Sequence, residues 1–134
     1  MTATRGEALI LLSEQDVVLA RQAIRKVSRQ FGFSIVDQTK IVTAASELAR
    51  NAVVYGGGGR LEWEIVAHNG RQGLRLTVVD HGPGIADVAL AMKDGWSSGT
   101  GLGLGLPGAK RLMNEFEITS QPGVGTTVSV TRWK

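Results

Sequence analysis

Residues 61–79 read LEWEIVAHNGRQGLRLTVV, and this stretch decides the fold class. Leu61–Val66 alternates apolar and polar residues, Leu74–Val79 does much the same, and Asn69-Gly70 lies between them. Such alternation is typical of half-buried strands, and Asn-Gly is a dipeptide that two-residue hairpin turns prefer. We therefore predict two neighbouring antiparallel strands.

A short buried strand over residues 7–12 and a helix over residues 14–30 are predicted before this hairpin. Ser13 is followed three residues later by Asp16, a carboxylate variant of the capping box that begins helices. Gly32 ends the helix. The core-facing residues of this helix recur at helical spacing: Val17, Ala20, Ile24 and Val27.

A second helix is predicted over residues 36–55, and the glycine run 56–59 ends it. The run is unusually rich in glycine for a connection to the next strand. The core-facing residues of this helix are Ile41, Ala45, Leu48 and Ala52.

The remainder of the chain returns to strands. We expect a short helical stretch near 86–92, a glycine-rich loop over 95–105 and a helix over 107–114, followed by a hairpin with strands over 116–119 and 126–131. Helices come early and strands pair through hairpins. The sequence therefore predicts an α+β two-layer sandwich, with helices on one face of a mixed, mainly antiparallel sheet, and not an alternating βαβ fold.

Composition excludes several classes of protein. The chain has 134 residues, 43% of them hydrophobic, which is enough for one domain with its own core. It has no Cys, so a disulfide scaffold and a cysteine nucleophile are excluded, and two His argue against a metal enzyme. The 15 Lys and Arg are scattered, which gives no support for a nucleic-acid partner. The apolar run at residues 8–12 is too short for a signal peptide or a membrane span, so we expect a cytoplasmic protein.

Glu47 and Asn51 are the first candidate site. They lie four residues apart on the second predicted helix, at the edge of its buried face. A carboxylate there could accept a proton, and an amide oxygen could hold hydrated Mg²⁺. An ordinary solvated helix face is the alternative, and the contribution of Arg50 between them is left open.

The segment Asp80-His-Gly-Pro-Gly84 is the second candidate. It follows a predicted interior strand, where a carboxylate can accept a hydrogen bond from an exocyclic amine and glycines let the backbone approach a flat ring. A simple Pro-Gly turn is the alternative. Similarly, Thr126 could reach a ligand or could merely favour a strand.

The third candidate is the loop over residues 95–108, where alternating glycines leave backbone N–H groups free to meet phosphate oxygens before a helix begins. A structural loop is the alternative. Residues 103–108 match G-x-G-x-x-G, but a loop precedes them where a dinucleotide-binding fold needs a strand. A Walker A loop is excluded because no Gly-Lys-Ser/Thr follows the glycines.

The order of these motifs resembles the GHKL superfamily of ATPases and kinases, whose Bergerat fold the whole chain is similar to. That order is a helical E-x-x-x-N, then D-x-G-x-G, a glycine-rich loop and G-T on the last strand. The segments over residues 46–51, 80–84, 91–95 and 101–112 especially resemble the RsbT switch kinases of bacterial stressosomes.

The resemblance implies that Glu47 is the general base, that Asn51 holds Mg²⁺, and that Asp80 accepts a hydrogen bond from the adenine amino group of ATP. Residues 86–100 would be the ATP lid. The other binding positions that it implies are Gly82 and Gly84 at adenine, Gly101, Leu102, Gly103, Leu104 and Gly105 at the triphosphate, and Thr126 beside adenine.

An intact Glu47 favours a kinase for Ser or Thr, because kinases of the histidine type often lack this acid. The resemblance implies that the acceptor lies on a STAS-domain scaffold or antagonist, and that the kinase then activates a PP2C-type phosphatase regulator. An anti-sigma factor that sequesters a sigma factor is one alternative, and a bare ATPase is another. We expect no membrane partner.

Overall fold

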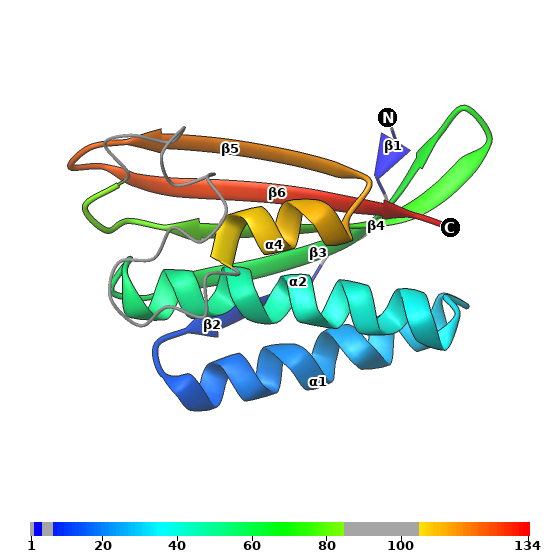
Figure 1. Cartoon of the computed structure of the whole chain (residues 1–134), viewed down its shortest axis with the longest axis horizontal. Helices are drawn as coiled ribbons and strands as arrows, with labels where there is room; N and C mark the ends of the chain where they lie inside the picture. The colour runs from blue at the N-terminus through cyan, green and yellow to red at the C-terminus, as the bar shows by residue number, and fades with distance from the viewer. Residues whose placement is uncertain (1, 4–6, 85–104) are drawn as a thin grey trace.

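The computed structural model describes residues 2–3, 7–84 and 105–134. Three helices lie side by side on one face of a single sheet (Figure 1). The helices are α1 (Glu14–Gln30), α2 (Ile35–Val54) and α4 (Gly105–Leu112). The strands are β1 (Thr2–Ala3), β2 (Glu7–Leu11), β3 (Gly59–His68), β4 (Arg71–Asp80), β5 (Glu115–Gln121) and β6 (Gly125–Trp133).

The predicted α+β two-layer sandwich is confirmed. Its strand order is β1-β3-β4-β6-β5, and β2 also pairs with β3. Every strand pair among the described residues is antiparallel, so this part of the sheet is more uniform than the mixed one that we expected. The helical stretch expected near 86–92 lies outside the described residues.

Both predicted hairpins are present, β3–β4 and β5–β6. At the first turn Asn69 and Gly70 have φ values of 50° and 79°. Two consecutive positive φ angles match the right-handed twist of the flanking strands, which is why Asn-Gly is preferred there.

Helix α1 has the predicted bounds and the predicted start. The Asp16 carboxylate accepts hydrogen bonds from the backbone N–H groups of Ser13 (3.1 Å) and Leu12 (2.8 Å). The predicted core stripe is correct except at its end, where Ser28 is fully buried and Val27 is only half-buried. The reason is geometric, since at 3.6 residues per turn position 28 falls closer to the line through Val17 and Ile24.

The expectation of a buried strand at the N-terminal end is wrong in its burial. Strand β2 forms, but only Leu11 is buried, and Ile10 is 58% exposed. Strand β2 pairs with β3 and with no other described strand, so it lies at an edge of the sheet. A short apolar run does not distinguish an edge strand from an interior one.

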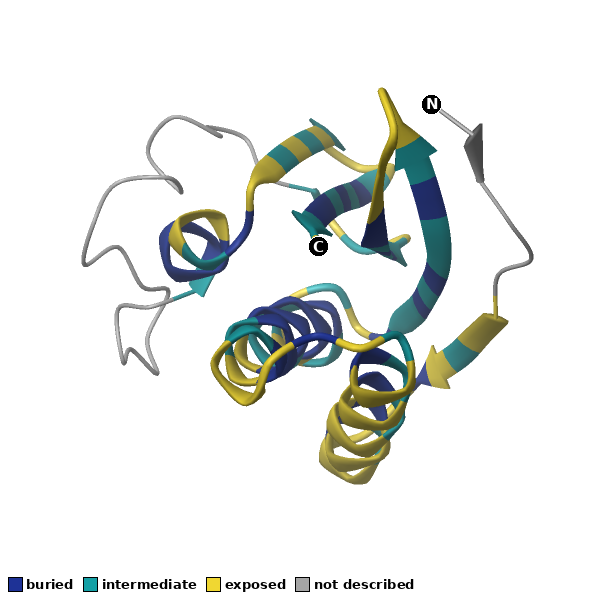
Figure 2. Cartoon of the chain, turned by 90° about the vertical axis from the view of Figure 1, so that its right-hand side faces the viewer, coloured by how far each residue is buried: buried dark blue, intermediate teal, exposed yellow. Residues whose placement is uncertain are grey.

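Helix α2 is the central element of the helical layer, between α1 and α4 (Figures 1 and 2). It begins and ends one residue before the predicted bounds. Its buried face includes four alanines that are no more than 1% exposed, and such small side chains let the neighbouring elements approach closely. The alanines are Ala44, Ala45, Ala49 and Ala52. No helix among the described residues is long and apolar enough to cross a lipid bilayer.

Candidate functional site

Asp80 and Thr126 lie on neighbouring strands at one end of the sheet. Asp80 is the last residue of β4, and it is in register with Gly59 of β3 and Thr126 of β6. Paired residues of adjacent strands share a face, and so do residues two apart along a strand. Val78 and Val128, two residues away, are buried in the core. Asp80 and Thr126 therefore lie on the helix-covered face.

The turn that follows α2 contacts Asp80 at this end of the sheet. A Cβ atom at Gly56 would lie 2.5 Å from Cγ of Asp80, so the carboxyl group packs directly against the glycine backbone. The N–H of Gly56 donates to the carbonyl oxygen of Asn51 (3.2 Å), which ties the turn to the last turns of α2. The Asp80 segment thereby contacts the turn that directly follows the helix carrying Glu47 and Asn51.

Gly82, in the loop after β4, contacts both Asp80 and Gly56. Its N–H donates to Oδ1 of Asp80 (3.0 Å), and a Cβ atom at residue 82 would lie 2.6 Å from Cα of Gly56. Residues 56 and 82 thus approach backbone to backbone, which larger side chains would prevent. The Gly84 loop reaches the β5–β6 turn, where the N–H of Gly123 donates to the carbonyl oxygen of Pro83 (2.8 Å).

Thr126 is 8% exposed, and its hydroxyl is 2.8 Å from the Ser120 hydroxyl on β5. The Ser120 hydroxyl can also donate to the carbonyl oxygen of Gly125 (3.3 Å), and the Thr126 oxygen keeps a lone pair that can accept from a ligand. Ser120 and Gly56 are not among the site residues predicted from the sequence. Ser120 lies in a segment whose alternation is fully explained by a strand, and Gly56 lies in a glycine run that is explained as the end of a helix. Neither pattern therefore indicates a binding residue.

Glu47 and Asn51 are both half-buried and lie one turn apart on α2, beside the fully buried Leu48 and Ala52. They therefore occupy the predicted edge of the buried face. Arg50 points elsewhere: its Nε is 3.9 Å from Glu14 Oε1 of α1, and both side chains are more than half exposed. Arg50 is thus a surface residue that bridges α1 and α2.

Much of the predicted triphosphate loop lies outside the described residues. This applies to Gly101, Leu102, Gly103 and Leu104, and to the predicted lid over residues 86–100. Gly105 is described, and it begins helix α4, two residues before the predicted start. Contact of these residues with phosphate stays a prediction.

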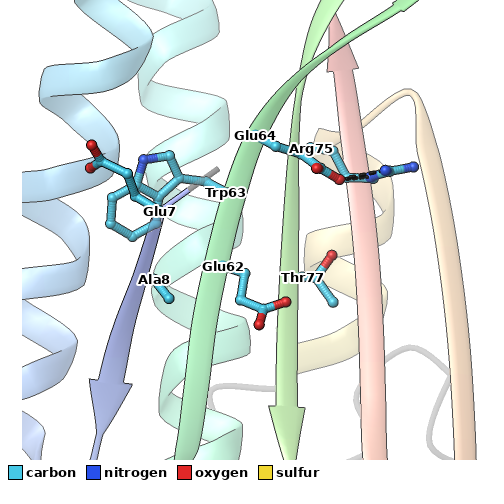
Figure 3. A pocket seen from close by; sticks show the side chains of 7 residues that line it. All are labelled: Glu7, Ala8, Glu62, Trp63, Glu64, Arg75 and Thr77. Atoms are coloured by element: carbon cyan, nitrogen blue, oxygen red, sulfur yellow. Dashed lines mark hydrogen bonds and ion pairs between the residues drawn. The ribbon is translucent and has the colours of Figure 1, made fainter. Parts of the chain in front are cut away.

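The described residues also form a hollow of about 300 Å³ on the opposite, open face of the sheet (Figure 3). Its floor includes the ion pair of Glu64 with Arg75, whose Nε donates to the carboxylate at 2.8 Å. None of the predicted site residues lines it. The lining residues are Glu7, Ala8, Glu62, Trp63, Glu64, Arg75 and Thr77.

The described residues contain no group of three or more His, Asp or Glu side chains that could hold a metal ion by themselves. Mg²⁺ does not need such a group, because it is commonly bound by one or two protein ligands together with phosphates and waters. The half-buried amide of Asn51, near the Asp80 end of α2, fits that mode of binding.

Comparison with known proteins identifies relatives along almost the whole chain. The family model for the histidine kinase-like ATPase domain matches residues 11–132. The serine/threonine-protein kinase RsbT of Bacillus subtilis is 48% identical over 123 residues, which cover 92% of each chain. An anti-sigma F factor of Halalkalibacterium halodurans is 30% identical over 119 residues, covering 85% of this chain and 82% of the relative.

A solved structure with the same fold comes from Mycobacterium tuberculosis, and it contains RsbU and RsbW domains. It superposes with a TM-score of 0.68 at 22% sequence identity, over 98% of this chain and 33% of that chain. At this identity the likeness concerns the fold alone.

Proposed function

This chain belongs to the family of histidine kinase-like ATPase domains and is a serine/threonine-protein kinase, and on that premise we propose which residues carry its chemistry and which partners it serves. The observation that carries the proposal is the contact of Asp80 with the glycine turn that follows Glu47 and Asn51 on α2. It supports the proposal because it joins the end of β4, which carries Asp80, to the turn directly after the helix that carries Glu47 and Asn51.

Asp80 binds the adenine amino group through its carboxylate in this proposal. The carboxylate is fixed by the Gly82 N–H, and the free oxygen can accept a second hydrogen bond. Thr126, in register with Asp80, supports the ring from β6. The backbone of Gly82 lets the flat ring approach closely.

Glu47 orients the acceptor hydroxyl and takes its proton as the γ-phosphoryl group of ATP is transferred in line. Backbone N–H groups of the loop before Gly105 stabilise the charge on the phosphates. Asn51 would hold Mg²⁺, which, when bound, neutralises charge on the phosphate oxygens. Positioning and electrostatics therefore supply most of the rate enhancement that the site can give.

The acceptor hydroxyl belongs to a STAS-domain scaffold or antagonist of a stressosome-like pathway, and the kinase afterwards activates a PP2C-type phosphatase regulator in the cytoplasm. The similarity to RsbT supports this assignment. A second candidate is an anti-sigma factor that sequesters a sigma factor, which the 30% identity to an anti-sigma F factor favours.

The experiment follows the label from γ-labelled Mg-ATP in a soluble extract of the source cell, with the native protein and Glu47→Ala compared. Label on Ser or Thr of a STAS-domain protein, lost with Glu47→Ala, is the expected result. Label released only as phosphate would indicate a bare ATPase. A protein that binds ATP, shows no Glu47-dependent transfer and co-purifies with a sigma factor would instead favour the second candidate.

A further inference from the structure

Arg132 is a charged residue at an inward-facing position of β6. It is in register with Leu74 of β4, which is fully buried, and Val130 two residues earlier is fully buried as well. Its side chain is only 18% exposed. A guanidinium among such neighbours needs polar partners, because burial removes its water.

The partners of Arg132 come from two different helices. Its Nη2 donates to Oδ1 of Asp37 (3.0 Å), in the first turn of α2. Its Nη1 donates to the carbonyl oxygen of Leu112 (3.1 Å), the last residue of α4. A carbonyl at a helix C-terminus has no partner within the helix, so it is free to accept this bond. One side chain thus joins the start of α2 to the end of α4.

Stability alone does not explain an arginine here. Its Nε is buried and has no hydrogen-bond partner among the described residues. An unpaired buried donor costs free energy, and buried ion pairs are often no more stabilising than hydrophobic residues of similar volume. A methionine would fill this space without a stranded donor. An arginine can instead fix the relative position of the two helices, because its planar, forked guanidinium binds a group on each of them at once.

The two helices that Arg132 joins carry two parts of the proposed site, Glu47 on α2 and Gly105 on α4. Along α2, Glu47 lies about 15 Å from Asp37, and along α4, Gly105 lies about 10 Å from Leu112, at 1.5 Å per residue. The helices pack against each other and run antiparallel, so the last turns of α2 and the first turn of α4 point to the same end of the molecule (Figure 1).

We propose that Arg132 is a positioning residue for phosphoryl transfer, which holds α4 in register with α2 so that Gly105 and Glu47 keep their spacing. This inference rests on the proposed function. Small displacements matter in such a site, since a misplacement of about 1 Å can lower the rate about 100-fold. We expect adenine binding to survive loss of this contact, because Asp80 and Thr126 are paired directly in the β4–β6 ladder and neither contacts α4 through Arg132.

The test compares Arg132→Met with Arg75→Met. Arg75 also forms an ion pair from a half-buried position, but on the open face of the sheet, away from the helices. Calorimetric titrations give the affinities for Mg-ATP and for adenosine, and steady-state assays with the protein acceptor give kcat. For Arg132→Met we expect the ratio of ATP to adenosine affinity to fall about tenfold, with a lower kcat and unchanged adenosine affinity. Arg75→Met should leave the ratio unchanged.

Asp37→Ala keeps the inference testable if Arg132→Met does not fold, and it should lower the same ratio. Arg132→Lys should restore only part of it, because an ammonium lacks the fork. The inference would be overturned if the affinity ratio and kcat were unchanged in both Arg132→Met and Asp37→Ala. It would also be overturned if Arg75→Met lowered the affinity ratio as much as Arg132→Met does. Native protein that binds neither ATP nor adenosine would overturn the proposed function and this inference together.

Discussion

The carboxyl group of Asp80 packs against the backbone of Gly56, so closely that a Cβ atom at residue 56 would lie 2.5 Å from Cγ and 2.7 Å from Cβ of Asp80. The contact joins the end of β4 to the turn that follows α2. Glycine is needed at residue 56 for space, and the position of the carboxylate depends on it.

Gly56→Ala should therefore displace the Asp80 side chain and lower ATP affinity about tenfold or more, measured by titration calorimetry. The matched control is Gly57→Ala, where a Cβ atom would meet nothing within 4 Å but φ is +71°. That control should cost about 1 to 2 kcal/mol of stability through its backbone conformation and leave ATP affinity unchanged. Equal ATP affinities in the two variants would contradict the proposed place of Asp80.

Asp80→Asn should abolish the preference for ATP over GTP. The substitution keeps an oxygen that can accept the Gly82 N–H but removes the carboxylate that would accept from the adenine amino group. Competition between the two nucleotides, at equal concentrations, measures the preference. Retained selectivity for ATP would remove Asp80 from the adenine site.

Glu47→Ala should leave nucleotide binding nearly intact and lower phosphoryl transfer about 100-fold or more, which is the usual contribution of a general base. Binding is measured by titration and transfer by the labelled acceptor. Asn51→Ala is the companion variant, and it should lose the Mg²⁺ dependence of ATP binding. Transfer at the native rate in Glu47→Ala would show that another group takes the proton.

Arg50→Ala should change little, although Arg50 lies between Glu47 and Asn51 in the sequence. Its ion pair with Glu14 is solvent-exposed on both sides, so its removal should lower the free energy of unfolding by less than about 1 kcal/mol. Urea denaturation measures this, with Glu14→Ala as the control for the other half of the pair. A large fall in ATP affinity would place Arg50 in the site after all.

Local patterns predicted most of the fold. The Asn69-Gly70 turn and the alternation around it determined the β3–β4 hairpin, and the Asp16 cap determined where α1 begins, because each depends on neighbours in sequence. The helical spacing of Glu47 and Asn51 likewise determined their common side of α2. These features need no knowledge of the rest of the chain.

Contacts between distant segments were not predictable in this way. Nothing near Gly56 in the sequence indicates that Asp80 will pack on it, so the run 56–59 stands out only as unusually rich in glycine for a connection to a strand. Gly59 is needed for a similar reason, since any Cβ there would collide with the carbonyl oxygen of Val79 on β4. Arg132 has one signal in the sequence, a charge at the inward spacing of Val128 and Val130. Its partners lie on two helices far from it in sequence.

The pairing of β4 with β6 has a consequence for folding. The hairpins β3–β4 and β5–β6 close between neighbouring segments, whereas β4 and β6 meet only after the intervening chain has been brought round, which costs more loop entropy. Asp80 lies on the β4 side of this pairing and Thr126 on the β6 side. Recovery of adenine binding during refolding should therefore report the late joining of two preformed hairpins, and it should lag behind the appearance of strand structure.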